Sequence, residues 1–222
     1  MPNWPMGLAS PMSSAEISMS RKAVIHQQRR VFDDFFKIDE IVVSHEQRDG
    51  TVSAKQKQLV FERGDSVAVL LFNRDTKSVV LVEQFRAAAM VRRRRDDPAT
   101  TNGWIVETVA GMIDPHETAE AAAIRETMEE TGYRIRDPQL IGKVFASPGG
   151  SSERVFVYFA EVGDADRQGK GGGVDGEDVE VVHMPLADLF AHLAQKSIED
   201  AKLLIAAYWL ENYLKASEAL QT

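Results

Sequence analysis

Residues 111–133 read GMIDPHETAEAAAIRETMEETGY, and this stretch is the most informative in the chain. Residues 118–131 within it are helical in composition, and Gly132 is suited to ending a helix. An apolar segment, Trp104–Val109, precedes the stretch and reads as a short strand leading to Gly111. The sequence therefore predicts a strand, a loop and a helix in that order, with acidic side chains concentrated on the helix.

The acidic side chains of this helix share one face. At about 100° per residue, Glu126 and Glu130 point the same way, and Glu129 lies at the edge of their face. Ile124 and Met128 lie roughly opposite and are expected to face the core. Three small residues share the acidic face: Ala119, Ala122 and Ala123.

Two interpretations of this face are open, a solvated acidic surface and a metal site. Like charges four residues apart destabilise a helix by roughly 0.2–0.5 kcal/mol, which counts against a purely solvated role. A solvated face would also carry lysine, arginine or glutamine, whereas small alanines leave room above the helix. Carboxylates beside empty space suit magnesium, which prefers oxygen ligands and pairs with substrate phosphates. The residue pattern alone does not decide between the two.

The rest of the chain reads as strands with helices between and after them, which predicts an α/β sandwich with a mixed sheet and a small N-terminal antiparallel β appendage. The other strands are expected at Lys37–Ser44, Thr51–Phe61, Ser66–Phe72, Ser78–Phe85, Leu140–Ala146, Val155–Val162 and Val179–His183. Further helices are expected at Leu186–Gln195 and Ala201–Lys215. Residues 163–177 contain six glycines and no periodicity, so they are expected to form a long mobile loop.

Three regions are expected along the chain. Residues 1–30 begin with a segment rich in Pro, Ser, Gly and Met and are expected to be poorly ordered. Residues 31–63 would form the β appendage, and residues 64–222 the main domain. The run Arg92–Arg95 is expected to be a solvated polar loop rather than a phosphate-binding element.

Composition excludes several function classes. The chain has 222 residues, a net charge of −8 and no cysteine. The acidic balance disfavours nucleic-acid binding, and the missing cysteines exclude disulfides, thiolate zinc sites and cysteine nucleophiles. No stretch approaches the roughly 18 apolar residues of a membrane-spanning helix. We therefore expect a cytoplasmic protein with neither nucleic-acid nor membrane partners.

The spacing of the polar positions in residues 111–133 resembles the Nudix box. Gly111 is followed by Glu117, then by the pairs Arg125-Glu126, Glu129-Glu130 and Gly132-Tyr133, at the intervals of that motif. The resemblance implies the Nudix α/β/α sandwich. Thr127 departs from the pattern, because the family usually has an aliphatic residue there. We expect this change to adjust packing and leave the chemistry intact.

Other segments resemble the ADP-ribose pyrophosphatase and GDP-mannose pyrophosphatase branch of the same family. The ADP-ribose enzymes usually have a proline where this chain has Val109, which favours the GDP-mannose relatives. Gln58 and Leu59 stand where those relatives carry charged residues for the nucleotide, so the base stays open. The segments are Val82–Arg86, Val106–Gly111, Ser147–Gly150 with Glu153, Gly171–Val174, Glu177–Glu180 and Asp200–Lys202.

The resemblance implies a role for each matching residue. Glu126, Glu130, Glu177 and the backbone carbonyl of Ala110 would hold Mg²⁺, with Mn²⁺ able to substitute. Glu129 would be a third catalytic carboxylate or a support. Arg125 would hold a neighbouring carboxylate, and Glu117 would fix the loop before the helix.

Substrate contacts are implied at Arg86, Glu153 and Lys202. Arg86 would clamp the pyrophosphate; its alternative is a surface arginine at a strand end. Glu153 would contact the substrate; its alternative is an exposed loop acid. For Glu177 the alternative is an acidic loop with no role.

The implied activity is metal-dependent hydrolysis of the pyrophosphate bond of a nucleoside diphosphate sugar, of the ADP-ribose or GDP-mannose type. A catalytically inactive Nudix-fold binding or regulatory protein is the main alternative. An isopentenyl-diphosphate isomerase activity is disfavoured, because the family's usual cysteine is absent. A homodimer is expected, because the antiparallel segment 37–61 is too small to be stable alone. The resemblance also implies that such an appendage contacts a second subunit.

Overall fold

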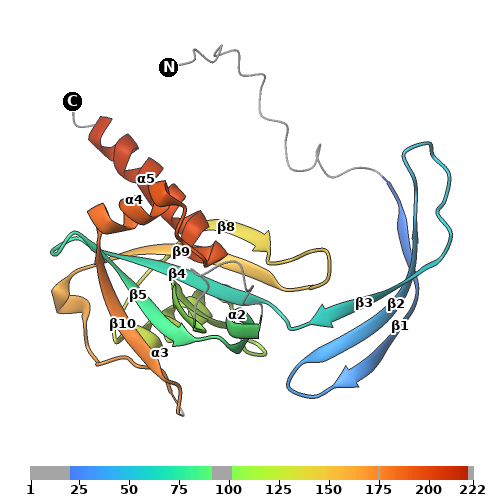
Figure 1. Ribbon diagram of the computed structural model, residues 1–222, viewed down its shortest axis with the longest axis horizontal. Coiled ribbons are helices and arrows are strands. Elements are labelled where there is room, and N and C mark those ends of the chain that lie inside the picture. Colours follow the sequence, from blue (N-terminus) through green and yellow to red (C-terminus); the bar gives the residue numbers. More distant parts are fainter. Residues whose placement is uncertain (1–20, 92–101, 175, 220–222) are drawn as a thin grey trace. The chain divides into compact units, whose positions relative to one another are not determined.

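The computed structural model describes residues 21–91, 102–174 and 176–219, and it divides the chain into two units, Met1–Glu62 and Arg63–Thr222 (Figure 1). The expectations for residues 1–20 and for Arg92–Arg95 lie outside the described residues. Each unit is described by itself below.

In its described part, the N-terminal unit is a three-stranded antiparallel sheet in the order β1-β2-β3 (Figure 1). The strands are β1 (Ala23–Asp33), β2 (Lys37–His45) and β3 (Gln56–Glu62). The strand expected over Thr51–Phe61 begins only at Gln56, after an isolated bridge at Val52. The expectation of poor order up to residue 30 is wrong for residues 23–30, which lie in β1.

Charge pairing explains why β1 forms without an apolar alternation. Every residue of β1 is exposed, so the hydrophobic pattern gives no signal. Arg29 lies directly opposite Glu40, with Nε 2.8 Å from Oε1, and Arg30 lies opposite Asp39 and forms an ion pair with it. Opposite charges directly across a ladder stabilise strand pairing. The register of β1 on β2 therefore rests on these pairs.

In the described residues of the second unit, a seven-stranded mixed sheet is the central layer. The path is β10-β5-β4-β9-β8, with β6 paired to β5 and β7 paired to β4. β4 and β9 are parallel, and the other pairs are antiparallel. The strands are β4 (Ser66–Asn73), β5 (Ser78–Phe85), β6 (Trp104–Glu107), β7 (Val109–Met112), β8 (Gln139–Phe145), β9 (Arg154–Val162) and β10 (Val179–Pro185).

The sheet forks between β4 and β5. These strands pair over Leu71–Asn73 and Ser78–Val80, and beyond that point β6 pairs with β5 while β7 pairs with β4. The expected single strand over Trp104–Val109 is therefore two strands, separated at Thr108. The chain crosses the fork at this residue, which is fully buried.

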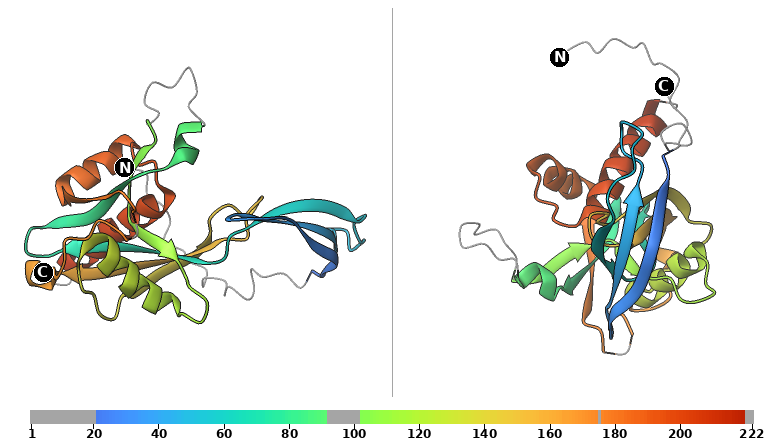
Figure 2. Two further views of the ribbon diagram at one scale, coloured as in Figure 1. Left: turned by 90° about the horizontal axis from the view of Figure 1, so that it is seen from below. Right: turned by 90° about the vertical axis from the view of Figure 1, so that its right-hand side faces the viewer.

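Helices cover both faces of the sheet, which confirms the α/β sandwich. α3 (Ala119–Thr131) lies on one face, and α4 (Leu186–Gln195) and α5 (Ala201–Ala219) lie on the other (Figure 2). Alternate residues of β4 supply the two cores: Val67, Val69 and Leu71 on the α3 side, and Ala68, Leu70 and Phe72 on the α4 and α5 side. This explains the uninterrupted apolar run of β4.

Two short helical segments complete the unit, α2 (Ala87–Val91) and a 3₁₀ turn, η1 (Asp164–Asp166). No helix within the described ranges is long and apolar enough to cross a membrane.

The buried face of α3 is broader than the expected one. Ala122, Ala123 and Thr127 are fully buried, and Ile124 is half-buried but packs against the same core, as expected, whereas Met128 is only half-buried. The small residues let the helix lie close to the sheet. Thr127 fits this interior because its hydroxyl donates to the Ala123 carbonyl at 2.7 Å, so no polar atom is left unpaired.

Candidate active site

The helix α3 has defined ends that fix which residues face the sheet. The Thr118 hydroxyl accepts a hydrogen bond from the Ala121 N–H at 3.1 Å and caps the first turn. Gly132 has φ 73° and donates its N–H to the Met128 carbonyl at 3.0 Å. A left-handed residue at this position ends a helix, and glycine adopts it without strain. The helix therefore spans the acidic residues without a break.

Gly111 makes room for Glu126. A side chain on Gly111 would overlap the Glu126 carboxylate, which lies directly over this position of β7. The backbone angle of Gly111 is not the reason for glycine here, because its φ is not positive. The fifteen-residue separation of the two residues in the motif therefore reflects a contact across the strand–helix packing.

Glu130 is a buried carboxyl group with two neutral donors. It is 4% exposed, and it accepts hydrogen bonds from Gln84 Nε2 at 3.1 Å and from the Ala110 N–H at 3.2 Å. Burial, reinforced by the charge of Glu126, raises the pKa of Glu130 to about 8, against the opposing effect of these donors and of Arg86. A negative charge here lacks a sufficient counter-charge.

Glu126 shares this environment. Burial raises its pKa above the ordinary value, and the charges of Glu129 and Glu177 act in the same direction. The Arg125 guanidinium opposes the shift but does not cancel it. The two carboxyl groups that the Nudix resemblance implies as principal metal ligands are thus both destabilised as anions. This destabilisation suits a site that binds a cation.

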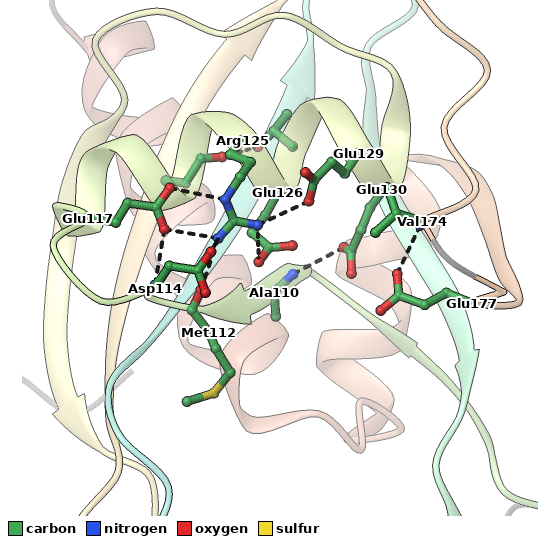
Figure 3. Close-up of polar contacts among 12 residues, drawn as sticks. Ala110, Met112, Asp114, Glu117, Arg125, Glu126, Glu129, Glu130, Val174 and Glu177 are labelled. Carbon is green, nitrogen blue, oxygen red and sulfur yellow. Dashed lines mark hydrogen bonds and ion pairs between the residues drawn. The ribbon is translucent and has the colours of Figure 1, made fainter. Parts of the chain in front are cut away.

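Arg125 joins the acidic residues of the motif (Figure 3). Its guanidinium donates to Glu117 at 3.0 Å, to Glu126 at 2.8 Å and to Glu129 at 3.0 Å. It also donates to the Met112 carbonyl at 3.1 Å, which ties the helix to the end of β7. Arg125 therefore holds Glu126 and Glu129 as neighbours that would otherwise repel each other.

The glycine-rich segment before β10 makes specific backbone hydrogen bonds in its described part, and the expectation that it is mobile stays a prediction. Gly172 and Gly173 donate their N–H groups to the carbonyls of Glu130 and Glu129 at 2.8 and 3.1 Å. These carbonyls belong to the last turn of α3, where no intrahelical partner exists. A side chain on Gly171 would overlap this turn. The glycines thus permit close packing on the helix end.

Glu177 lies just beyond this segment. Its side chain is exposed, and its carboxylate accepts a hydrogen bond from the Val174 N–H at 3.2 Å (Figure 3). It is close enough to Glu126 for its charge to raise the pKa of that residue. The fold therefore brings Glu177 to the edge of the α3 carboxylates.

Arg86 lies at the end of β5 and pairs with Glu107 of β6. Both Nε and Nη2 of Arg86 donate to the same oxygen, Oε2, at 3.1 and 2.6 Å. Lys202 is 3.8 Å from the other oxygen of Glu107 and 2.6 Å from Asp200 Oδ1. Lys202 is therefore engaged by two carboxylates of its own chain.

Glu153 is half-buried just before β9. Its Oε1 accepts a hydrogen bond from the Ser66 hydroxyl at 2.8 Å. Ser66 pairs with Met112 on one side and with Val155 on the other, so Glu153 lies near the end of β7 that carries Gly111. It is not a freely exposed loop acid.

Among the described residues, no three acidic or histidine side chains converge closely enough to hold a metal ion as they lie. The hydrogen bonds explain this arrangement, because Glu126 and Glu129 are directed to Arg125 while Glu130 is directed to Gln84 and Ala110.

Sequence reasoning missed two polar residues at this site, Gln84 and Glu107. Both lie in strands made mostly of apolar residues, and both are buried, at 9% and 6% exposure. A buried polar residue in an apolar strand usually has a specific partner. That signal was present in VEQF and WIVE, but the partners are distant in sequence.

The chain belongs to the Nudix family, because the NUDIX domain model matches residues 62–207. Its similarity to individual proteins extends over nearly the whole chain. It is 35% identical over 193 residues to the GDP-mannose pyrophosphatase of Cronobacter sakazakii, covering 87% of this chain and 97% of that protein. It is 33% identical over 202 residues to the GDP-mannose pyrophosphatase of Citrobacter koseri, covering 91% and 100%.

A solved structure agrees with the fold. The crystal structure of ADP compounds hydrolase superposes with a TM-score of 0.64 and covers 88% of this chain and 96% of that one. At 19% identity this likeness supports the architecture alone. The family model and the GDP-mannose pyrophosphatase relatives confirm the resemblance of residues 111–133 to the Nudix box at the level of the family.

Proposed function

We propose that this chain hydrolyses the pyrophosphate bond of a nucleoside diphosphate sugar, with GDP-mannose as the first candidate, to a nucleoside monophosphate and a sugar phosphate. The observation that carries this proposal is the pair of buried carboxyl groups, Glu126 and Glu130, whose pKa values are both raised. The reaction would require a divalent cation, Mg²⁺ first and Mn²⁺ as a substitute.

The donor set fits a hard divalent cation. Carboxylate and carbonyl oxygens are the ligands that Mg²⁺ prefers. The Ala110 N–H donates to Glu130, and the N–H and C=O of one residue in an antiparallel strand point to the same edge, so we propose the Ala110 carbonyl as a ligand beside Glu130. A cation shared by Glu126, Glu130 and this carbonyl would replace like-charge repulsion with attraction. Glu177 is the fourth ligand we propose.

The protein's own residues would bind and orient the substrate around this centre. A bound cation would screen the pyrophosphate charge and lower the pKa of attacking water. Arg125 would keep Glu126 and Glu129 in place. Among the described residues, Nη1 of Arg86 has no hydrogen-bond partner, so this edge is available to a phosphate oxygen.

Glu153 and Lys202 have weaker support as substrate contacts. The Glu153 carboxylate retains one oxygen beyond its bond to Ser66. The Lys202 side chain is 23% exposed and already paired with Glu107 and Asp200. We therefore propose that it supports Glu107 rather than contacting the substrate.

The choice of GDP-mannose rests on the relatives named for that activity, and ADP-ribose is the second candidate. The test compares kcat/KM for GDP-mannose, ADP-ribose, dinucleoside polyphosphates and nucleoside triphosphates with Mg²⁺, with products identified. A nucleoside triphosphate as the best substrate would overturn the proposal. No turnover of any of them would favour an inactive binding or regulatory protein.

We also propose that the chain is a homodimer whose N-terminal sheet contacts a second copy. That sheet, by itself, leaves large apolar side chains exposed, and exposed apolar groups of this size mark interaction surfaces. They include Val24, Ile25, Phe32, Phe35, Phe36 and Leu59. A monomeric mass by light scattering at micromolar concentration would contradict this proposal. The expected cytoplasmic location stays a prediction.

A further inference from the structure

A group of ion pairs lies beside the α3 carboxylates but is not part of the Nudix box. It consists of Arg86, Glu107, Asp200 and Lys202, here called the Glu107 network. Burial lowers the pKa of Arg86, but hydrogen bonds from Arg86 to Glu107 and the charges of Glu107, Glu130 and Asp200 more than offset this, so its pKa is raised. The network and Glu130 therefore share one electrostatic environment.

Glu107 fixes the orientation of the Arg86 guanidinium. Nε and Nη2 of Arg86 both donate to one carboxylate oxygen, which leaves Nη1 on the far edge. Arg86 directly follows β5, two residues after Gln84, and the charge of Glu130 acts on its guanidinium, so both side chains lie in the part of the site that contains Glu130. The Arg86 side chain remains 39% exposed, so its free edge can be reached by a ligand.

Glu107 itself is held rigidly. Its side chain is 7% exposed at the fork of the sheet, and a buried carboxylate requires partners to stay ionised. Arg86 occupies one oxygen, and Lys202 approaches the other at 3.8 Å. Lys202 is held by Asp200, whose carboxylate also accepts the Leu203 N–H at 3.0 Å at the start of α5. The position of Glu107 thus depends on both β6 and α5.

We infer that Glu107 is a positioning residue for the reaction, which acts through Arg86 to hold the guanidinium where it can bind a phosphate oxygen next to Glu130. The inference rests on the proposed role of Arg86 in binding the pyrophosphate. Glu107 would touch neither substrate nor cation. Its loss should matter only as long as Arg86 is present.

A double-mutant cycle of Arg86→Ala and Glu107→Gln tests this dependence, with kcat and KM measured for the best substrate. We expect Glu107→Gln alone to reduce kcat/KM by about tenfold to a hundredfold, since misplacing a clamp by about 1 Å has effects of this size. In the Arg86→Ala background the same change should cost less than about threefold, because residues that act as a unit are non-additive. Equal losses in both backgrounds would overturn the inference.

A second variant separates position from charge. Glu107→Asp keeps the charge but withdraws the carboxylate, so it should also raise KM if geometry matters. Removing the charge alone makes the surroundings of a polyanionic substrate more positive, so a purely electrostatic role predicts a lower KM in Glu107→Gln and no change in Glu107→Asp. That pattern would contradict positioning.

Matched controls make the outcomes distinguishable. Glu83→Gln removes a carboxylate from the same strand as Arg86 but from the opposite sheet face, and should leave kcat/KM within about twofold. Thermal unfolding of each variant identifies any that fail to fold, and Glu107→Asp then carries the test if Glu107→Gln is one of them. A normal Glu107→Gln enzyme with an impaired Arg86→Ala enzyme would refute this inference alone. Normal kinetics in Arg86→Ala would refute the proposed role of Arg86 as well.

Discussion

Asp39 in the N-terminal sheet and Glu130 in α3 have similarly low solvent exposure, 5% and 4%, but Glu130 is packed between a helix and a sheet whereas Asp39 lies within a three-stranded sheet, and their pKa values shift in opposite directions. The pKa of Asp39 is lowered, first by its hydrogen bond from Arg30 and then by that from Gln28. The pKa of Glu130 is raised to about 8, first by burial. Asp39 has its own cation, whereas Glu130, within the described residues, accepts hydrogen bonds only from amide donors, and the charge of Arg86 does not offset its burial. A buried acid left without a counter-charge points to a cation that the chain does not supply.

Among the changes that test this contrast, removal of divalent cations should have the largest effect on hydrolysis. After EDTA treatment and desalting we expect hydrolysis to fall to background, because Glu126 and Glu130 then repel each other and the substrate. Addition of Mg²⁺ or Mn²⁺ should restore it. Unchanged hydrolysis with excess EDTA would contradict a metal-dependent reaction.

Neutralising Glu130 should have the next largest effect. Glu130→Gln is expected to lower kcat by at least about a hundredfold, because it removes a charged ligand from a site whose chemistry depends on the cation. The control is Glu211→Gln, which removes a half-buried acid of the same type from α5, where it pairs with Lys215, and should leave kcat within about twofold. A kcat of Glu130→Gln within a few fold of wild type would contradict the inference that Glu130 binds a cation.

Substitution of Glu177 should have a smaller effect on kcat, with a wider expected range. Glu177→Gln is expected to lower kcat by about tenfold to a thousandfold with folding intact, as for one positioned ligand or base. Asp178→Asn alters the neighbouring exposed acid and should be milder. Near-normal kcat for Glu177→Gln across pH would assign the role to another acid, with Glu153 or Glu180 next in line.

The stability of the metal-free protein should depend on pH in a way that separates the two acids. The folded pKa of Glu130 lies above its ordinary value of 4.5, so the folded state retains a proton that the unfolded state releases. Its contribution is fully present below about pH 4.5 and is lost as pH rises towards about 8, with a slope of at most about 1.4 kcal/mol per pH unit. Glu130→Gln should have a shallower slope in urea unfolding between pH 5 and 8, and the raised pKa of Glu126 should account for the remainder.

Asp39 should behave in the opposite way. Its folded pKa lies below 3.8, so its contribution is present above that value and is lost as pH falls through the lower folded pKa. Asp39→Asn should flatten the acid limb and leave the limb between pH 5 and 8 unchanged. An acid limb identical to that of wild type would mean that the Arg30 pair does not stabilise the sheet.

The sequence predicted the helix α3 and its carboxylates because they form a local, periodic pattern with a clear end signal at Gly132. It did not predict β1, since the partners of Arg29 and Arg30 lie in the next strand and no apolar alternation marks the segment. It also placed β6 and the first residue of β7 in one strand, because the sequence of residues 104–109 says nothing about which neighbour each part pairs with.

The arrangement of the candidate site was only partly accessible for the same reason. The pattern identified Glu126 and Glu130, but the contacts that define them come from Gln84, Gly111 and Ala110, which lie on strands. Arg86 and Glu107 are 21 residues apart and meet only through strand pairing. Local spacing therefore predicts which residues share a helix face. Contacts between residues on different strands can be predicted only when the strand order of the sheet is known.

The hydrogen bonds from Gly172 and Gly173 to the end of α3 have a consequence for protein engineering. An insertion or deletion between Gly169 and Gly173 would shift both donors and would disturb the turn that carries Glu129 and Glu130. The turn at Gly50 in the N-terminal sheet has no such neighbour, since a side chain there would meet open space. Peptide tags or grafted loops should therefore be accepted at the turn and rejected in the glycine run, although both are glycine-containing surface segments.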